Sequence, residues 1–168
     1  MKLRTNVGVA LVAAMSVAML HGVANAQINT AATGDLFVGT TWVGGSVPGA
    51  GDTAAILAPH LAFTAGGTPN VFGADELQIS GTLRTTHAGA TPLTVNDLVL
   101  NNGGRLWGFG SNSTRVVVGG TLTLLDGGIL ESRNQNNRTL KIDATQVVGA
   151  GTITINTEGS FLENSIDI

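Results

Sequence analysis

The sequence contains no cysteine and no tyrosine, and few of its residues are aromatic or charged. Without cysteine the chain cannot form disulfide bonds, so its stability must come from a regular hydrogen-bonded core. Only 11% of the residues are charged and 43% are hydrophobic, which is too apolar for a disordered chain. The scarcity of Glu and Lys also argues against a helical protein, because the solvent-exposed faces of helices are rich in those residues. Glycine, by contrast, is abundant at 24 residues.

The N-terminal segment over 1–26 has the features of an export signal. Lys2 and Arg4 precede an uncharged, mainly apolar run over 7–20, and the small-residue site Ala24-Asn25-Ala26 follows it. This is the pattern of a secretory signal peptide, and the apolar run is shorter than the roughly 20 residues that a membrane span needs. We therefore predict a cleaved signal peptide over 1–26, export through the Sec pathway, and a secreted, cell-surface or periplasmic location.

The predicted mature chain over 27–168 is acidic. Without Lys2 and Arg4, six of the eight Lys and Arg residues remain against eleven Asp and Glu, a net charge of −5. An acidic chain without a basic cluster argues against nucleic acid and anionic membranes as partners. Nothing after residue 26 is long and apolar enough for a membrane-spanning helix. The expected partners are a surface glycan or another cell-surface protein.

Short runs of alternating polar and aliphatic residues, bounded by Gly, Asn and Asp, predict β-strands. The expected strands lie at 76–80, 97–101, 115–118, 121–124, 139–143 and 152–156.

The strands belong to a repeated unit of aliphatic-x-aliphatic, a Gly or Asn turn, and Gly-x-Leu. The unit recurs at variable spacing from Leu77 to Leu98 and from Leu98 to Leu122, and the segment 119–132 resembles 150–164. Such repeats indicate a β-solenoid, because stacked coils bury together an aliphatic face that one coil cannot bury alone. A β-sandwich is the competing interpretation. We predict an all-β solenoid of about five or six coils, with a capping segment over 27–57 and repeat coils over 58–168.

The segment over 41–56, TWVGGSVPGAGDTAAI, resembles the opening of bacterial autotransporter-like β-helix passengers, which combine Trp, Val-Pro and Gly-Asp-Thr. The Gly-Thr-Leu and Gly-Gly-x-Leu units at 81–83, 120–122, 127–130 and 151–153 are similar to passenger repeats. The resemblance implies a right-handed parallel β-helix displayed outside the cell as an adhesin, matrix component or enzyme carrier. Passengers are followed by a membrane β-barrel, which this sequence does not contain. We therefore expect a free solenoid or the front of a longer product, with an end open to end-to-end self-association.

No pattern of catalytic or metal-ligating residues emerges. His60 and His87 lie in no ligand spacing, and Asp52 is expected to cap a turn rather than hold a cation. If Leu77 and Leu98 stack on adjacent coils, Glu76 and Asp97 stack as well. Such a pair of carboxylates is a candidate for general acid/base catalysis. The alternative is that both are solvent-exposed residues at the starts of their strands. We predict no catalytic residue, no metal, no cofactor and no enzymatic activity.

The candidate ligand contacts are aromatic and polar. Trp42 is expected to close the first coil over the end of the core. Trp107 and Phe109 follow a Gly-Gly turn and are interpreted as a sugar-stacking loop or as aromatics that cover a corner. The most polar run is expected to form a projecting loop that contacts a glycan or partner, and it comprises Arg133, Asn134, Gln135, Asn136, Asn137 and Arg138.

The leading functional hypothesis is a non-enzymatic secreted or cell-surface β-solenoid with a structural or adhesive role. The first alternative is a carbohydrate-active β-helix enzyme. The second is a secreted glycan- or ice-binding module, because the Thr-x-Thr pairs at 121–123 and 152–154 could form threonine rows, although the β-propensity of threonine also explains them.

Overall fold

The computed structural model describes residues 26–88, 90–109, 113–133, 139–149, 152, 154–158 and 165–168. The predicted signal peptide up to residue 25 and the part of the predicted polar loop over 134–138 lie outside these residues. Nearly all regular structure in the described part is strand, with one short 3₁₀ helix, η1 (Gly39–Thr41).

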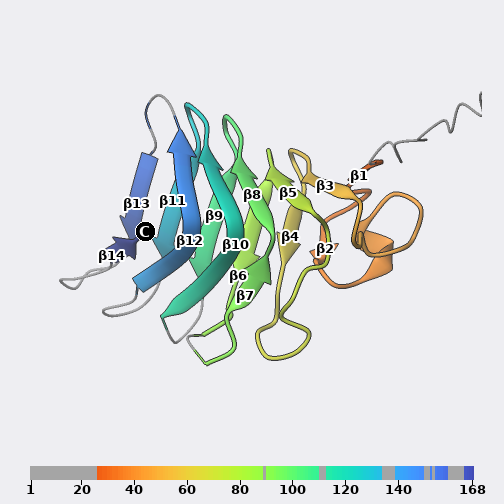
Figure 1. Ribbon diagram of the computed structural model, residues 1–168, viewed down its shortest axis with the longest axis horizontal. Helices are drawn as coiled ribbons and strands as arrows, with labels where there is room; N and C mark the ends of the chain where they lie inside the picture. The colour runs from red at the N-terminus through yellow and green to blue at the C-terminus, as the bar shows by residue number, and fades with distance from the viewer. Residues whose placement is uncertain are drawn as a thin grey trace, which may run out of the picture.

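The strands form two parallel sheets, which Figure 1 shows one behind the other. The front sheet contains β1 (Gln27–Asn29), β3 (Thr53–Ile56), β5 (Glu76–Ile79), β7 (Leu93–Val95), β8 (Asp97–Leu100), β10 (Thr114–Leu124), β12 (Thr139–Gly149) and β14 (Ser165–Asp167). The back sheet contains β2 (Gly34–Asp35), β4 (Leu61–Phe63), β6 (Thr82–Thr85), β9 (Arg105–Phe109), β11 (Ile129–Arg133) and β13 (Thr154–Glu158).

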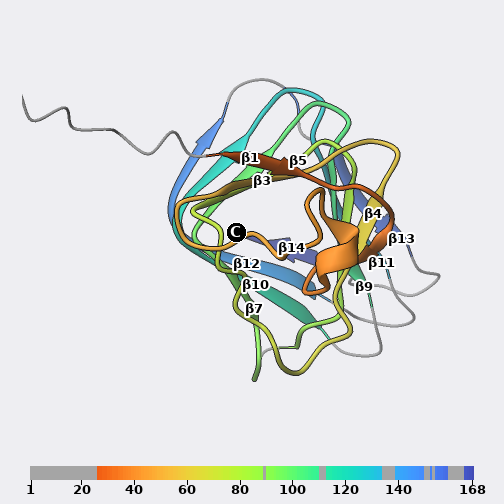
Figure 2. The same cartoon turned by 90° about the vertical axis from the view of Figure 1, so that its right-hand side faces the viewer.

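The chain alternates between the two sheets and builds a parallel β-solenoid of about five turns. Each turn lies in parallel register on the one before it, as Glu76 lies beside Thr53 and Asp97 beside Glu76. The front sheet is bent, because β7 pairs with the first half of β10 and β8 pairs with its second half. The end view in Figure 2 therefore shows three faces around one core. The all-β solenoid predicted from the repeats is confirmed.

The core consists of aliphatic columns that run along the solenoid. One column on the front sheet stacks Ala54, Leu77, Leu98 and Leu122, all buried. A matching column on the back sheet stacks buried leucines from β6, β9 and β11: Leu83, Leu106 and Leu130. Burying each leucine of these columns contributes about 1.5–3 kcal/mol. The neighbouring residues of each strand point outward because side chains alternate.

The turns from the front to the back sheet require glycine. A Cβ atom on Gly104 would lie 1.9 Å from the backbone oxygen of Ile79, and one on Gly81 would lie 2.5 Å from that of His60. Successive turns stack so closely that a glycine α-hydrogen fits at these two positions but a Cβ atom does not. This is the physical reason for the Gly that opens the Gly-x-Leu units at 81–83 and 104–106.

The N-terminal end of the core is closed by the segment around Trp42 (Figure 2). The Trp42 indole is 1% exposed, stacks on the Phe72 ring at 5.5 Å between centroids, and donates a hydrogen bond to the Leu36 carbonyl. The expectation that Trp42 closes the core end is confirmed. The chain around Trp42 also pairs in antiparallel fashion with Thr30, so it shields the outer edge next to β1.

The front-sheet core column ends differently near the C-terminus. Val147 is the register partner of Leu122, yet its side chain is 48% exposed. Among the described residues, β14 pairs only with Thr139–Lys141 of β12, so the second half of β12 has a strand neighbour on one side. The column is therefore open at this position.

One part of the predicted repeat register is wrong. The resemblance of 119–132 to 150–164 predicts that these segments stack on each other. Instead, the strand over 121–124 stacks on 146–149 of the front sheet, and Thr154 stacks on Ile129 of the back sheet. The Thr-x-Thr segment over 121–123 lies within β10 of the front sheet, whereas Thr154 of the second segment begins β13 of the back sheet. The repeats from Leu77 to Leu98 and from Leu98 to Leu122, in contrast, are confirmed as register pairs.

Candidate functional site

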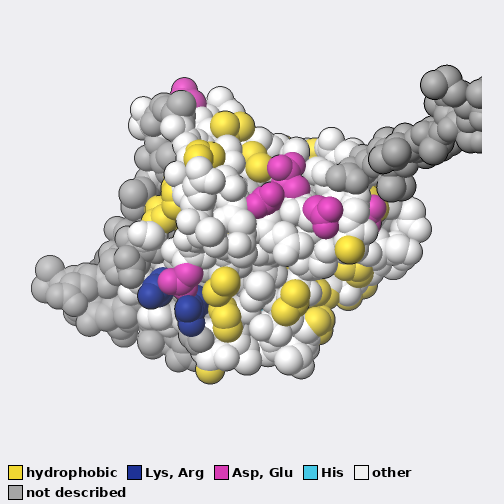
Figure 3. All heavy atoms as spheres, in the orientation of Figure 1, with side chains coloured by type: hydrophobic (Ala, Val, Ile, Leu, Met, Phe, Trp, Pro, Cys, Tyr) yellow, Lys and Arg dark blue, Asp and Glu magenta, His cyan; other side chains and the backbone are white. Residues whose placement is uncertain are grey.

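The outer face of the front sheet carries the carboxylates that the sequence suggested as a catalytic pair. Glu76 and Asp97 are register partners on adjacent strands, as expected, and acidic side chains gather over β3, β5 and β8 in Figure 3. Each has a local partner: Glu76 accepts a hydrogen bond from the Gln78 amide at 2.6 Å, and Asp97 accepts one from the Thr121 backbone N–H at 2.6 Å. No basic residue stands beside them in the register. These bonds favour the interpretation of two surface residues that fix strand starts.

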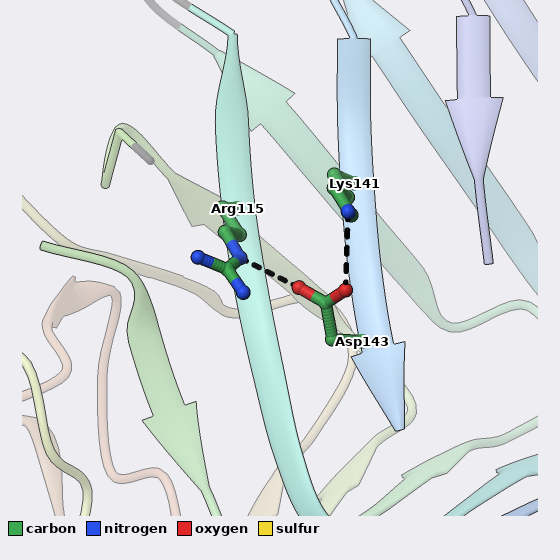
Figure 4. A network of polar contacts seen from close by, with 3 residues as sticks. All are labelled: Arg115, Lys141 and Asp143. Atoms are coloured by element: carbon green, nitrogen blue, oxygen red, sulfur yellow. Dashed lines mark hydrogen bonds and ion pairs between the residues drawn. The ribbon is translucent and has the colours of Figure 1, made fainter. Parts of the chain in front are cut away.

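A second polar group on this sheet joins two coils. Asp143 accepts a hydrogen bond from Arg115 Nε at 2.6 Å and lies 3.3 Å from Lys141 Nζ (Figure 4). The hydrogen bond from Arg115, more than any other contact, lowers the pKa of the Asp143 carboxyl below its ordinary value. All three side chains are about a third exposed or more, so this network contributes at most a few tenths of a kcal/mol. It is a surface link between β10 and β12.

The outer face of the back sheet is different in character. Phe63, Arg84 and Trp107 form one row across β4, β6 and β9, and Phe109 lies two positions further along β9. The Arg84 Cζ atom lies 5.4 Å from the Phe63 ring centroid, 5.9 Å from that of Trp107 and 5.2 Å from that of Phe109. Trp107 and Phe109 meet edge to face at 5.0 Å. We call these four residues the aromatic–arginine cluster.

Of the two interpretations of Trp107 and Phe109, a sugar-stacking loop or aromatics that cover a corner, the loop is wrong. Both lie on strand β9 and point outward, while Gly108 between them faces inward. A Cβ atom on Gly108 would lie 2.3 Å from Thr114 Oγ1 and 3.2 Å from Leu140 Cβ, so this glycine fits a crowded core position instead of making a turn. The strand places both rings rigidly, and Phe109 remains 38% exposed.

Arg84 is a member that the sequence reasoning missed. Arg84 lies on the coil before Trp107 and is its register partner. Because Leu83 stacks on Leu106, the next residue of each strand also pairs, and this pairing is the signal that predicts Arg84 beside Trp107. Cation–π contacts with three rings hold the Arg84 guanidinium in place. Each such contact stabilises by about 0.5–1 kcal/mol at an exposed site and by more where water is excluded.

A buried carboxylate lies next to the cluster. Glu131 is the register partner of Trp107 and is only 2% exposed, although it belongs to the outward row. Its Oε2 atom is 3.3 Å from Arg105 Nε, an ion pair whose geometry is not that of a hydrogen bond. Arg105 therefore compensates a carboxylate that has lost most of its water.

The predicted polar loop is only partly described. Arg133 ends β11 with its backbone in register with Phe109, which places it beside the cluster. The other members of that prediction lie outside the described residues: Asn134, Gln135, Asn136, Asn137 and Arg138.

The histidines do not form a site. His60 Nδ1 lies 2.8 Å from Thr30 Oγ1, whereas His87 is fully buried with Nδ1 at 3.0 Å from the Thr91 carbonyl oxygen. Burial lowers the pKa of His87, against weaker opposing effects of the Thr91 carbonyl and Asp35. In the described part of the chain, no group of three or more His, Cys, Asp or Glu residues is arranged to hold a metal ion. Asp52 Oδ2 accepts a hydrogen bond from the Gly49 N–H, so its expected role as a turn cap is confirmed.

The threonine rows of an ice-binding face do not form. Thr121 and Thr123 are flanked on the next coil by Gln146 and Val148, and Thr154 belongs to the other sheet. This arrangement removes the physical basis of the ice-binding alternative, which needs paired threonines on consecutive coils.

The described residues contain no helix of the length and apolarity that crossing a membrane requires. No family model, no curated protein and no solved structure matches this chain. Inferences about its function therefore rest on the geometry of its two outer faces.

Proposed function

We propose that this chain is a non-enzymatic structural or adhesive β-solenoid of the cell exterior, and that it contacts a saccharide surface through the outer face of its back sheet. The observation that carries the proposal is the aromatic–arginine cluster. Trp, Tyr, Phe and Arg are enriched at recognition surfaces. The aromatic side chains combine large apolar area with few rotatable bonds, and Arg adds a planar charged group that stacks on aromatic rings. Aromatic rings held on rigid strands present flat apolar faces, against which the apolar face of a sugar ring packs.

The contrast between the two sheets supports this choice of face. Over β5 and β8 the front sheet presents Glu76, Gln78 and Asp97 in hydrogen bonds of their own, whereas over β4, β6 and β9 the back sheet presents partly exposed rings. Apolar side chains that gather on an otherwise polar surface mark contact sites more often than scattered ones do.

The proposal of a non-enzymatic role is supported by the arrangement of the acidic groups. Hydrolysis by two carboxylates requires that they flank one substrate bond and that one is free to donate or accept a proton. Glu76 and Asp97 are each engaged with a neighbour, and Glu131 is paired with Arg105. We expect neither the wild type nor Glu76→Ala to release reducing ends from polysaccharides. Release by the wild type that Glu76→Ala abolishes would contradict the non-enzymatic role.

Export is part of the proposal and has its own test. The signal pattern over 1–26 predicts that the protein recovered outside the cytoplasm begins at Gln27. N-terminal sequencing of that protein checks the cleavage site, and an intact N-terminus at Met1 would contradict export by this route.

A binding experiment with matched variants tests the contact surface. The purified protein is applied to an array of immobilised polysaccharides, together with the double variant Trp107→Ala/Phe109→Ala and the control Val43→Ala/Val71→Ala. The control removes two exposed apolar side chains, 60% and 62% exposed, that lie outside the cluster. We expect at least about a tenfold loss of affinity in the first variant and none in the control. Equal binding by both variants would place the contact surface elsewhere.

A further inference from the structure

The arginine of the aromatic–arginine cluster has no carboxylate partner among the described residues. The Arg84 side chain forms no hydrogen bond or ion pair with the described part of the chain, and its Nε atom is buried without a partner. Arg105 pairs with Glu131, and Arg115 pairs with Asp143. Among the arginines whose side chains are described, Arg84 is thus the one whose charge no carboxylate balances.

The three rings hold the Arg84 guanidinium but do not neutralise it. Phe63, Trp107 and Phe109 surround it within about 6 Å, which fixes its plane and removes part of its water. A partly desolvated charge is costly until a counter-charge approaches it, and a charge pair is stronger where water is partly excluded. The site is therefore prepared for an anion.

From this juxtaposition we infer that the cluster binds the anionic group of an acidic saccharide. The planar guanidinium of Arg84 receives a carboxylate or sulfate oxygen pair, and the exposed Phe109 ring, supported by Trp107, carries the adjoining sugar ring. This inference rests on the proposed saccharide contact and deepens it, because it names the charge class of the ligand. The preference for an anionic ligand follows from the Arg84 guanidinium and not from the net charge of the protein, because the predicted mature chain as a whole is acidic.

Surface plasmon resonance on three immobilised polymers tests the inference at about 0.15 M salt. Alginate carries carboxylates, dextran sulfate carries sulfates, and dextran is neutral. We expect at least one anionic polymer to bind about tenfold more tightly than dextran, and the stronger of the two identifies the anion. We expect Arg84→Gln to lose this preference, about tenfold in affinity.

Arg115→Gln is the matched control, because it removes one arginine charge from the other sheet. Equal losses in Arg84→Gln and Arg115→Gln, or an unchanged affinity of Arg84→Gln, overturn the inference. Arg84→Lys keeps the charge without the planar fork and is expected to bind between the wild type and Arg84→Gln; it provides the test if Arg84→Gln does not fold. Dextran binding as tight as that of the anionic polymers overturns the inference and leaves the proposed function intact. No binding to any polysaccharide, on these surfaces or on the array, overturns both.

Discussion

At the scale of single residues, glycine decides whether successive coils can stack. Gly104→Ala places a methyl group against the backbone of the preceding turn, where a Cβ atom would lie 1.9 Å from the Ile79 oxygen. We expect a loss of about 1–3 kcal/mol in the free energy of unfolding, which is typical of overpacking. Urea denaturation measures it. Gly49→Ala is the matched control, because a Cβ atom there meets nothing within 4 Å. Equal stability of the two variants would contradict the stacking of the turns.

His87 gives the protein a stability that depends on pH. Its ring is fully buried, its Nε2 atom has no hydrogen-bond partner among the described residues, and burial lowers its pKa. Because the folded-state pKa lies below the unfolded value of about 6.5, this stability is fully present above that pH and is lost as pH falls toward the folded-state pKa. We expect the thermal midpoint to fall between about pH 7.5 and pH 5, and to fall less in His87→Gln. Identical pH profiles would show that His87 does not make this contribution.

At the scale of strands, the pair of Arg105 on β9 and Glu131 on β11 links two coils. Arg105→Ala leaves a carboxylate that is 2% exposed without its counter-charge, and we expect a loss of about 1–3 kcal/mol in unfolding free energy. Adding Glu131→Gln to this variant removes the isolated charge and should restore part of the loss. Chemical denaturation of the single and double variants measures the coupling. If Arg105→Ala is as stable as the wild type, the pair does not stabilise the contact between β9 and β11.

The strands also show how far the sequence predicts this fold. The alternation around 76–80 and 97–101 predicts both strands and their register, because adjacent coils repeat the same Leu-x-aliphatic pattern. The Gly103-Gly104 turn just before them leads to the interpretation of Trp107 and Phe109 as a loop or a corner, whereas both lie on strand β9 and Gly108 between them fills a crowded inward position. Arg84 was missed because its role depends on neighbours one coil away on either side, which no local pattern contains.

At the scale of the whole molecule, the two ends of the solenoid differ. Trp42 closes one end, while Val147 leaves a core column 48% exposed near the other. An exposed core column beside a strand half that has only one neighbouring strand in the described part of the chain favours association with a second copy. We therefore expect the purified chain to self-associate as its concentration rises, and Val147→Glu to weaken this association. Val43→Glu is the control, because Val43 is exposed at the closed end. Sedimentation velocity measures the effect, and a wild-type chain that stays monomeric throughout would contradict it.

The proposed contact surface on the back sheet can be tested most directly with the two tryptophans of the chain. Trp42 is buried at the closed end and Trp107 belongs to the aromatic–arginine cluster, and the sequence contains no tyrosine. Trp42→Phe leaves Trp107 as the fluorescent reporter, and Trp107→Phe leaves Trp42. During a titration with whichever of alginate and dextran sulfate binds more tightly, we predict a saturable change of tryptophan emission in Trp42→Phe and none in Trp107→Phe. No change in Trp42→Phe, or the same change in both variants, would contradict a saccharide contact at the outer face of the back sheet.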